Sequence, residues 1–243
     1  MDPRLNIVAH RLKNVDRLIA VSGGKGGIGK SSVASTLALC LSKKNYRVGL
    51  LDLDFYGPSC HLILGIKGVY PEEEKGVVPP EVNGIRFMSI VYYAEDNPLI
   101  ARGIDISNSI IELLAITLWG ELDFLIIDMP PGIGDTTLDV IRLLKRIEFL
   151  VVTTPSKIAL ETVKKTLEML KEAGVPIIGV IENMKVKDSP WIKQEIEKFD
   201  VRYLGEIGFD RSFEEYLGNS EGLLTSSFAN DINKLISKHI KKS

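Results

Sequence analysis

The sequence has little cysteine and no long apolar run. Its 243 residues include two cysteines, Cys40 and Cys60, which are far apart and form no C-x-x-C pair. This scarcity argues against a disulfide framework and against a self-contained zinc or iron–sulfur site. No apolar stretch approaches the roughly 20 residues that a membrane span needs, and the N-terminal stretch lacks the apolar region of a signal peptide. We therefore expect a reduced, soluble, cytoplasmic protein.

An excess of charge is also missing. The 30 basic and 32 acidic residues give a net charge of −2, so a global electrostatic attraction to nucleic acid is not expected. Hydrophobic residues make up 45% of the chain and charged residues 26%, which is ordinary for a globular protein. No break in composition and no internal repeat divides the sequence. We therefore expect one domain over residues 1–243.

Short apolar strands alternate with amphipathic helical stretches. The expected strands are 18–21, 46–53, 85–91, 124–127, 149–153 and 177–181, and the expected helices are 29–43, 106–118, 136–145 and 158–172. Because the strands are apolar throughout, we expect a mostly parallel, twisted sheet covered by helices on both faces. This is the α/β class in a three-layer αβα arrangement. Residues 65–84, rich in Pro, Gly and Glu, are expected to form an exposed loop.

One glycine-rich stretch carries the strongest chemical signal. Residues 24–31, GKGGIGKS, fit the phosphate-binding pattern G-x-x-x-x-G-K-[ST] and lie between an expected strand and an expected helix. Glycines let backbone N–H groups turn toward phosphate oxygens, Lys30 can reach the β- and γ-phosphates, and the Ser31 hydroxyl can ligate Mg²⁺. The residues expected to bind nucleotide here are Gly24, Lys25, Gly26, Gly27, Ile28, Gly29, Lys30, Ser31 and Ser32.

Acidic residues follow two other expected strands. Asp52 and Asp54 come at the end of one strand, and Asp128 ends the LIID strand of a Walker B pattern. The carboxyl ends of strands line the ligand crevice of an open α/β sheet, so we expect all three near the P-loop. Asp128 is expected to hold Mg²⁺, and an aspartate of the first pair to orient or deprotonate the attacking water. The alternative for Asp52 and Asp54 is a pair of solvated strand-end carboxylates.

Two further residues bear on the nucleotide. Gly132 follows the Walker B strand and can offer its N–H to a γ-phosphate. The Asn183 amide can both donate to and accept from a purine edge, with a turn residue as the alternative. The guanine-reading sequence N-K-x-D does not occur in the chain. We therefore expect ATP or ADP, with Mg²⁺, rather than GTP.

These motifs together resemble the Mrp/MinD branch of the deviant Walker A ATPases, in the ParA/MinD superfamily. The matching segments follow the family's order and are 19–32, 48–65, 122–135, 149–157 and 179–184. The resemblance implies a P-loop NTPase fold and an ATP-dependent homodimer that sandwiches two nucleotides face to face. It implies that Lys25 reaches the phosphates of the partner subunit and that Asp54 positions the attacking water. It further implies that Asn183 holds the adenine.

The resemblance therefore divides the candidate residues by role. Those implied to be catalytic are Lys25, Lys30 and Asp54. Those implied to hold Mg²⁺ are Ser31, Asp52 and Asp128.

One departure from the family bears on the biological role. Mrp-type iron–sulfur carriers have a C-x-x-C shortly after the ENM motif, whereas residues 185–191 here read KVKDSPW. Lys, Asp and Ser cannot replace thiolate ligands of a [4Fe–4S] cluster. Segments 76–98 and 121–146 look closest to archaeal relatives that lack this pair, including the HypB-type protein of nickel–iron hydrogenase maturation. The expected function is that of an ATPase switch in metallocentre maturation. Nickel insertion with a nickel-binding partner protein is expected first, and iron–sulfur cluster delivery with a scaffold protein is the alternative.

Two alternatives remain open. A MinD/ParA-type role on membrane or DNA rests on the C-terminal stretch, where Ile232, Leu235 and Ile236 share one face; we expect this helix to dock on the domain instead. Cys60 and His61 together could form a soft-metal site, but we expect Cys60 to be a buried residue at a helix start.

Overall fold

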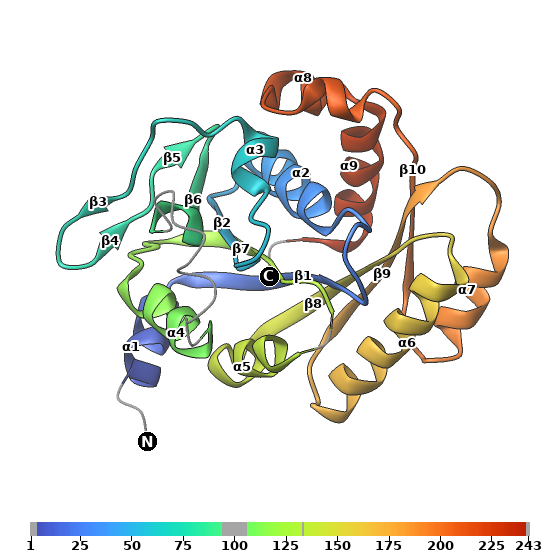
Figure 1. Cartoon of the computed structure of the whole chain (residues 1–243), viewed down its shortest axis with the longest axis horizontal. Helices are drawn as coiled ribbons and strands as arrows, with labels where there is room; N and C mark the ends of the chain where they lie inside the picture. Colours follow the sequence, from blue (N-terminus) through green and yellow to red (C-terminus); the bar gives the residue numbers. More distant parts are fainter. Residues whose placement is uncertain (1–3, 94–105, 133, 242–243) are drawn as a thin grey trace.

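The computed structural model describes residues 4–93, 106–132 and 134–241. Within them, eight strands form one twisted sheet in which all neighbours run parallel except the last pair, β6 and β5 (Figure 1). In spatial order the strands are β10 (Tyr203–Gly208), β9 (Ile177–Lys185), β8 (Ile147–Thr153), β1 (Val15–Gly23), β7 (Leu122–Asp128), β2 (Val48–Asp52), β6 (Ile85–Ser89) and β5 (Glu81–Val82).

Helices cover both faces of this sheet, and a separate apolar core lies under each layer (Figure 1). One layer consists of α2 (Lys30–Lys43), α3 (Cys60–Leu64), α8 (Ser220–Thr225) and α9 (Ser227–His239). The other consists of α1 (Arg4–Arg11), α4 (Ile106–Ile116), α5 (Asp135–Leu143), α6 (Lys157–Glu172) and α7 (Pro190–Glu197). Short 3₁₀ turns, η1 (Ile90–Tyr92) and η3 (Phe213–Tyr216), complete the described elements. The α/β class and the three layers predicted from the sequence are confirmed.

Continuous apolar strands are the reason for this architecture. Every residue of β2 and of β7 is buried, so neither face of these strands can meet water. None of the described helices is both long and apolar enough to cross a bilayer.

The expectation of a loop over residues 65–84 is wrong in part. Strands β3 (Glu72–Glu73) and β4 (Val77–Val78) form a small antiparallel ribbon, and β5 joins the main sheet. Val77 is buried in the same core as Trp119, and its carbonyl accepts from the N–H of Leu118 at 2.8 Å. These contacts join residues that are far apart in the sequence, and the local composition therefore predicted a loop.

The C-terminal helix α9 packs on the domain, as expected. Phe228, Ile232, Leu235 and Ile236 are buried in the core that α9 shares with α2 and β10. The apolar face that a membrane-gripping helix would need is therefore covered.

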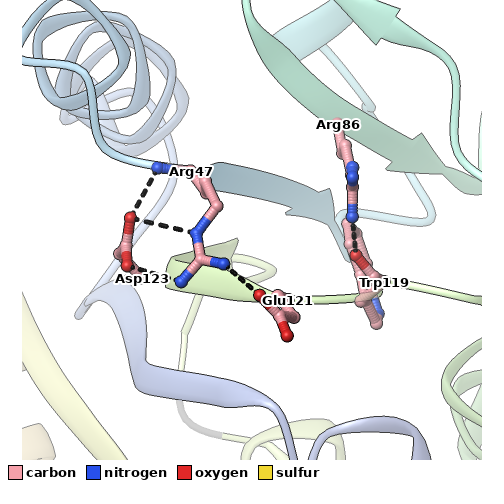
Figure 2. A network of polar contacts seen from close by, with 5 residues as sticks. All are labelled: Arg47, Arg86, Trp119, Glu121 and Asp123. Carbon is pink, nitrogen blue, oxygen red and sulfur yellow. Dashed lines mark hydrogen bonds and ion pairs between the residues drawn. The ribbon is translucent and has the colours of Figure 1, made fainter.

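A polar network holds β2 and β7 together at their amino ends (Figure 2). The buried Asp123 carboxylate accepts from the Arg47 backbone N–H at 2.7 Å and from its guanidinium at 3.0 Å. Arg47 also pairs with the exposed Glu121, and Arg86 donates to the carbonyl of Trp119. This network lies at the start of the strands, where it fixes their register.

Replacing Asp123 should therefore destabilise the fold. Asp123→Ala leaves the Arg47 N–H without its acceptor, so we expect the free energy of unfolding to fall by about 1–3 kcal/mol. Chemical denaturation measures this difference. The matched control is Glu121→Ala, which removes the exposed partner of the same arginine and should cost well under 1 kcal/mol. Equal costs for the two variants would contradict this account.

Candidate nucleotide-binding site

The glycine-rich loop lies at a switch point of the sheet, where the helices that follow neighbouring strands cover opposite faces. Strand β1 is central, between β8 and β7, and the helix after it, α2, covers one face. The helices after β7 and β8, which are α5 and α6, cover the other face. Such a switch point leaves a crevice beyond the carboxyl ends of the strands, where ligands bind in open α/β sheets.

Two glycines give this loop its shape. Gly27 and Gly29 have φ angles of 73° and 81°, a left-handed conformation that residues with a Cβ rarely adopt. Gly29 is also the residue before α2, and a Cβ there would lie 2.3 Å from the Asn183 amide nitrogen. The loop therefore presents the first N–H groups of a 14-residue helix to the crevice, which is a favourable site for phosphate.

Neighbouring elements brace the loop on two sides. A Cβ at Gly24 would meet Thr162 of α6 at 2.3 Å, so backbone and helix are in close contact there. On the other side, the side-chain amide of Asn183 donates to the carbonyl of Ile28 at 2.9 Å. Asn183 is 2% exposed. The sequence predicted this residue near the nucleotide and missed its contact with the loop, because 155 residues separate the two groups.

The two lysines of the loop differ in environment. Lys30 is buried, and its ammonium donates to the Lys25 carbonyl at 3.4 Å. Burial lowers the pKa of Lys30, while the carboxylates of Asp128 and Asp54 act in the opposite direction. The Lys25 side chain is half-buried, and no ion pair ties it to another residue in the described part of the chain. Lys30 is therefore held in place by its surroundings, whereas the described residues do not hold Lys25 by an ion pair.

Asp52 and Asp128 lie side by side at the ends of β2 and β7. The register of the two strands pairs them directly, and both are fully buried. Asp52 accepts from the N–H groups of Asp54, Ser59 and Cys60 at 3.0–3.2 Å, so it organises the loop after β2. Burial raises the pKa of both carboxyl groups, and the proximity of each to another carboxylate adds to this effect.

The surroundings of Asp128 fit a bound cation. Its Oδ2 accepts from the Cys60 thiol at 3.4 Å, whereas its Oδ1 is buried and has no hydrogen-bond partner among the described residues. An orphaned buried carboxylate oxygen is costly, and a divalent cation would satisfy it. Ser31, at the start of α2, interacts with the same carboxylate. The residues present therefore fit Mg²⁺, with Asp128 and Ser31 as the groups that would hold it.

The remaining predicted residues lie around this centre. Asp54 is half-buried, faces the charge of Lys30, and accepts from the N–H groups of Tyr56 and Gly57 at 3.2 and 3.1 Å. Gly132 has a φ of 87° and open space beside its Cα, so its backbone is free to approach a ligand.

A cavity of about 140 Å³ continues the crevice beyond the loop. Its lining comes from the start of α2, the ends of β9 and β10, the segment after β10 and the start of α9. The residues that line it are Ser32, Asn183, Met184, Gly208, Phe209, Asp210, Arg211, Phe213, Glu214 and Phe228. The apolar walls and a few polar groups suit a flat, partly polar ring.

Known proteins are similar to this chain in sequence and in fold. Residues 14–242 match the family described as NUBPL iron-transfer P-loop NTPase, of ParA type. An iron–sulfur cluster carrier protein from Aquifex aeolicus is 38% identical over 232 residues, which are 89% of this chain and 64% of that protein. The chain thus spans less than two-thirds of the length of that relative.

Solved structures agree with this assignment. A nucleotide-binding protein from Archaeoglobus fulgidus, in complex with ADP, superposes with a TM-score of 0.75 and 30% identity, covering 90% of this chain and 92% of that one. The septum site-determining protein MinD from Pyrococcus horikoshii, complexed with Mg-ADP, gives a TM-score of 0.69 at 23% identity, covering 93% and 96%. The second likeness concerns the fold alone.

The comparisons do not support the expected closeness to the HypB-type protein. The relatives from Aquifex aeolicus, Pseudomonas fragi and Escherichia coli are named iron–sulfur cluster carrier proteins. Residues 94–98 of the segment that suggested this closeness lie outside the described residues. That expectation rested on the missing C-x-x-C and on segments 76–98 and 121–146. The motifs, the sheet and the relatives agree on the broader assignment: this chain belongs to the ParA/MinD-type P-loop NTPases, in the family of NUBPL iron-transfer P-loop NTPases.

Proposed function

We propose that residues 1–243 form one ATPase domain that works as a nucleotide-controlled homodimer in iron–sulfur cluster assembly. One observation carries the proposal. The P-loop with its Lys30 lies beside Asp128 at the carboxyl ends of the strands, and the Oδ1 of Asp128 has no hydrogen-bond partner among the described residues. A loop of this kind binds the phosphates, and a buried carboxylate beside it receives the cation that accompanies them. The ADP named for the Archaeoglobus fulgidus relative supports ATP or ADP as the nucleotide, and the donor set of Asp128 and Ser31 supports Mg²⁺.

Each residue has a distinct task in this proposal. Backbone N–H groups over residues 24–32 surround the phosphates, and Lys30 neutralises charge on the β- and γ-phosphates. Mg²⁺, held by Ser31 and Asp128, supplies further positive charge to these groups. Asp52 supports the Mg²⁺ site indirectly, because its carboxylate holds the loop after β2 in place. Asp54 orients the water that attacks the γ-phosphate, and the N–H of Gly132 faces the same phosphate.

The cavity behind the loop is the proposed adenine site. Asn183 uses one amide hydrogen on Ile28, which leaves its second N–H and its oxygen for a purine edge. Phe209 and Phe213 supply apolar surface for the ring. No N-K-x-D sequence is present to read guanine. These features favour adenine.

The surface around the crevice supports a homodimer. An exposed apolar side chain follows each of the strands β2, β7, β8, β9 and β10, all at the edge that carries the P-loop. These side chains, between 44% and 72% exposed, are Tyr56, Leu138, Ile158, Val186 and Phe209. Exposed apolar groups gathered around one crevice are typical of an interaction site. A second copy placed there would bring its own Lys25 toward the nucleotide.

The biological role follows from the relatives and from the cysteines. The family and the named carriers support iron–sulfur cluster assembly. In this chain, however, both cysteines are buried, and residues 185–191 contain none. A [4Fe–4S] cluster needs several thiolates, so we propose that a scaffold partner supplies most of them and that this chain supplies the ATP-driven change of shape.

Loss of the gene in its native organism tests this role. We expect the activities of [4Fe–4S] enzymes to fall while their polypeptide levels stay constant, because clusters are no longer delivered. Wild-type protein and the surface variant Lys67→Ala should restore them, whereas Lys30→Ala should not. Unchanged iron–sulfur enzymes would contradict the role. A stoichiometric [4Fe–4S] cluster on the purified chain after anaerobic reconstitution would contradict the need for a scaffold.

A further inference from the structure

The thiol of Cys60 lies among the buried acidic residues of the crevice. Asp52, Cys60 and Asp128 each offer a ligand atom, and these three atoms lie within 4.8 Å of one another. They come from three different elements, β2, α3 and β7, and all three residues are 0% exposed. We propose that these residues form a binding site for a thiophilic divalent cation of the zinc class, distinct in its chemistry from a magnesium site.

The first support is the geometry of Asp128. Its Oδ2 already meets the thiol at 3.4 Å, and its Oδ1 makes no hydrogen bond in the described part of the chain, although Ser31 acts on the same carboxylate. A cation between sulfur and carboxylate would give both groups a partner at once. Asp52 is a weaker ligand, because its Oδ2 already accepts from two backbone N–H groups and its Oδ1 from one, which leaves a lone pair on Oδ1 alone.

The second support is the charge of the group. With Cys60 deprotonated, as a metal ligand must be, the two carboxylates and the thiolate would carry three negative charges, which is a costly set to bury without a cation. Lys30, whose charge acts on Asp128, supplies one positive charge. A divalent cation supplies the other two, so the buried set becomes neutral. The cluster and its lysine therefore match a cation of charge +2.

The third support is the kind of ligand. Mg²⁺ takes oxygen ligands in octahedral geometry, whereas a thiolate beside carboxylates suits zinc and similar metals. On binding, a metal–sulfur bond forms and the thiol proton leaves to solvent, with no change in oxidation state. Cys60 is buried at the start of α3, as the sequence predicted. The alternative metal site from the sequence paired Cys60 with His61, whereas the group in the structure combines Cys60 with two aspartates.

The proposal does not depend on ATP hydrolysis. The cation site can exist in a protein that never turns over ATP, and an active ATPase can leave Cys60 as a bystander. Where both hold, the thiophilic cation and Mg²⁺ compete for Asp128.

Cobalt(II) titrated into the metal-free full-length chain, without nucleotide, tests the site. Thiolate ligation gives an intense sulfur-to-cobalt charge-transfer absorption, which we expect to saturate at one ion per chain. The chain has only two cysteines, so Cys40→Ser is a matched control and should keep the band, while Cys60→Ser should lose it. Absence of the band from wild-type protein, or its persistence in Cys60→Ser, would overturn the proposal.

A second measurement needs no change at Cys60. Wild-type protein loaded with ¹¹³Cd²⁺ should show a cadmium NMR shift typical of mixed sulfur and oxygen ligands. Saturation with Cd²⁺ should weaken the binding of Mg-ADP, because both cations use Asp128. A shift typical of oxygen ligands alone would overturn thiolate ligation, and an unchanged affinity for Mg-ADP would place the ion at another site.

Discussion

Replacing Lys25 by alanine should abolish ATP hydrolysis while leaving ATP binding close to wild type. The Lys25 side chain is half-buried, whereas Lys30 and the glycine backbone are proposed to hold the phosphates of the same chain. A lysine that stabilises charge across the dimer acts on the transition state, so its loss should lower turnover by about 10³-fold or more. Phosphate release and equilibrium nucleotide binding, measured on the same sample, separate the two effects.

A matched control and a mixing experiment sharpen this prediction. Lys67→Ala removes an exposed lysine outside the crevice and should leave turnover unchanged. Lys25→Ala mixed with an equal amount of Asp54→Ala should regain activity, because a mixed dimer holds one site with its own Asp54 and the partner's Lys25. Random pairing then gives about a quarter of the wild-type rate. No recovery on mixing would show that Lys25 acts within its own chain.

Asp54→Ala should lower ATP turnover by about 10²- to 10⁴-fold and trap an ATP-bound dimer. The carboxylate is half-buried and faces Lys30, so it is placed to orient the attacking water rather than to bind phosphate. Light scattering with ATP should show the dimer persisting in this variant, whereas wild-type dimers should dissociate as ATP is consumed.

Asp54 also builds a turn, and the asparagine variant separates the two tasks. Its Oδ1 accepts from the N–H groups of Tyr56 and Gly57, which Asp54→Asn can preserve. If Asp54 handles water, Asp54→Asn should be nearly as inactive as Asp54→Ala. If Asp54→Asn retains wild-type turnover, the residue serves only the turn. Asp188→Ala, a change at a side chain that is 99% exposed, controls for the loss of one surface carboxylate.

Local pattern was enough to predict much of this structure. Residues close together in the sequence determine both the apolar runs that form β2 and β7 and the glycine spacing of residues 24–31. For the same reason Asp128 could be predicted at a strand end. Asp54 and Lys25 were identified by pattern as well, and their roles stay predictions.

Contacts between distant segments could not be predicted in this way. The thiol of Cys60 meets Asp128 across 68 positions because β2 and β7 are neighbours in the sheet, although four other β-strands lie between them in the chain. The bond from Asn183 to the P-loop spans 155 positions. Both depend on strand order, which a single sequence does not state. The ribbon formed by β3 and β4 was missed for a related reason, since its Val77 is buried by a distant segment.

Because β2 is anchored at both ends, insertions and deletions in this strand are restricted during evolution. Arg47 fixes the start of the strand against Asp123, and Asp52 must arrive beside Asp128 at its end. The length of β2, five residues, therefore fixes the position of Asp52 relative to the contact between Arg47 and Asp123. Adding or deleting one residue would turn Asp52 to the opposite face of the sheet, because side chains alternate along a strand. Loops elsewhere can vary in length, but the length of this strand cannot.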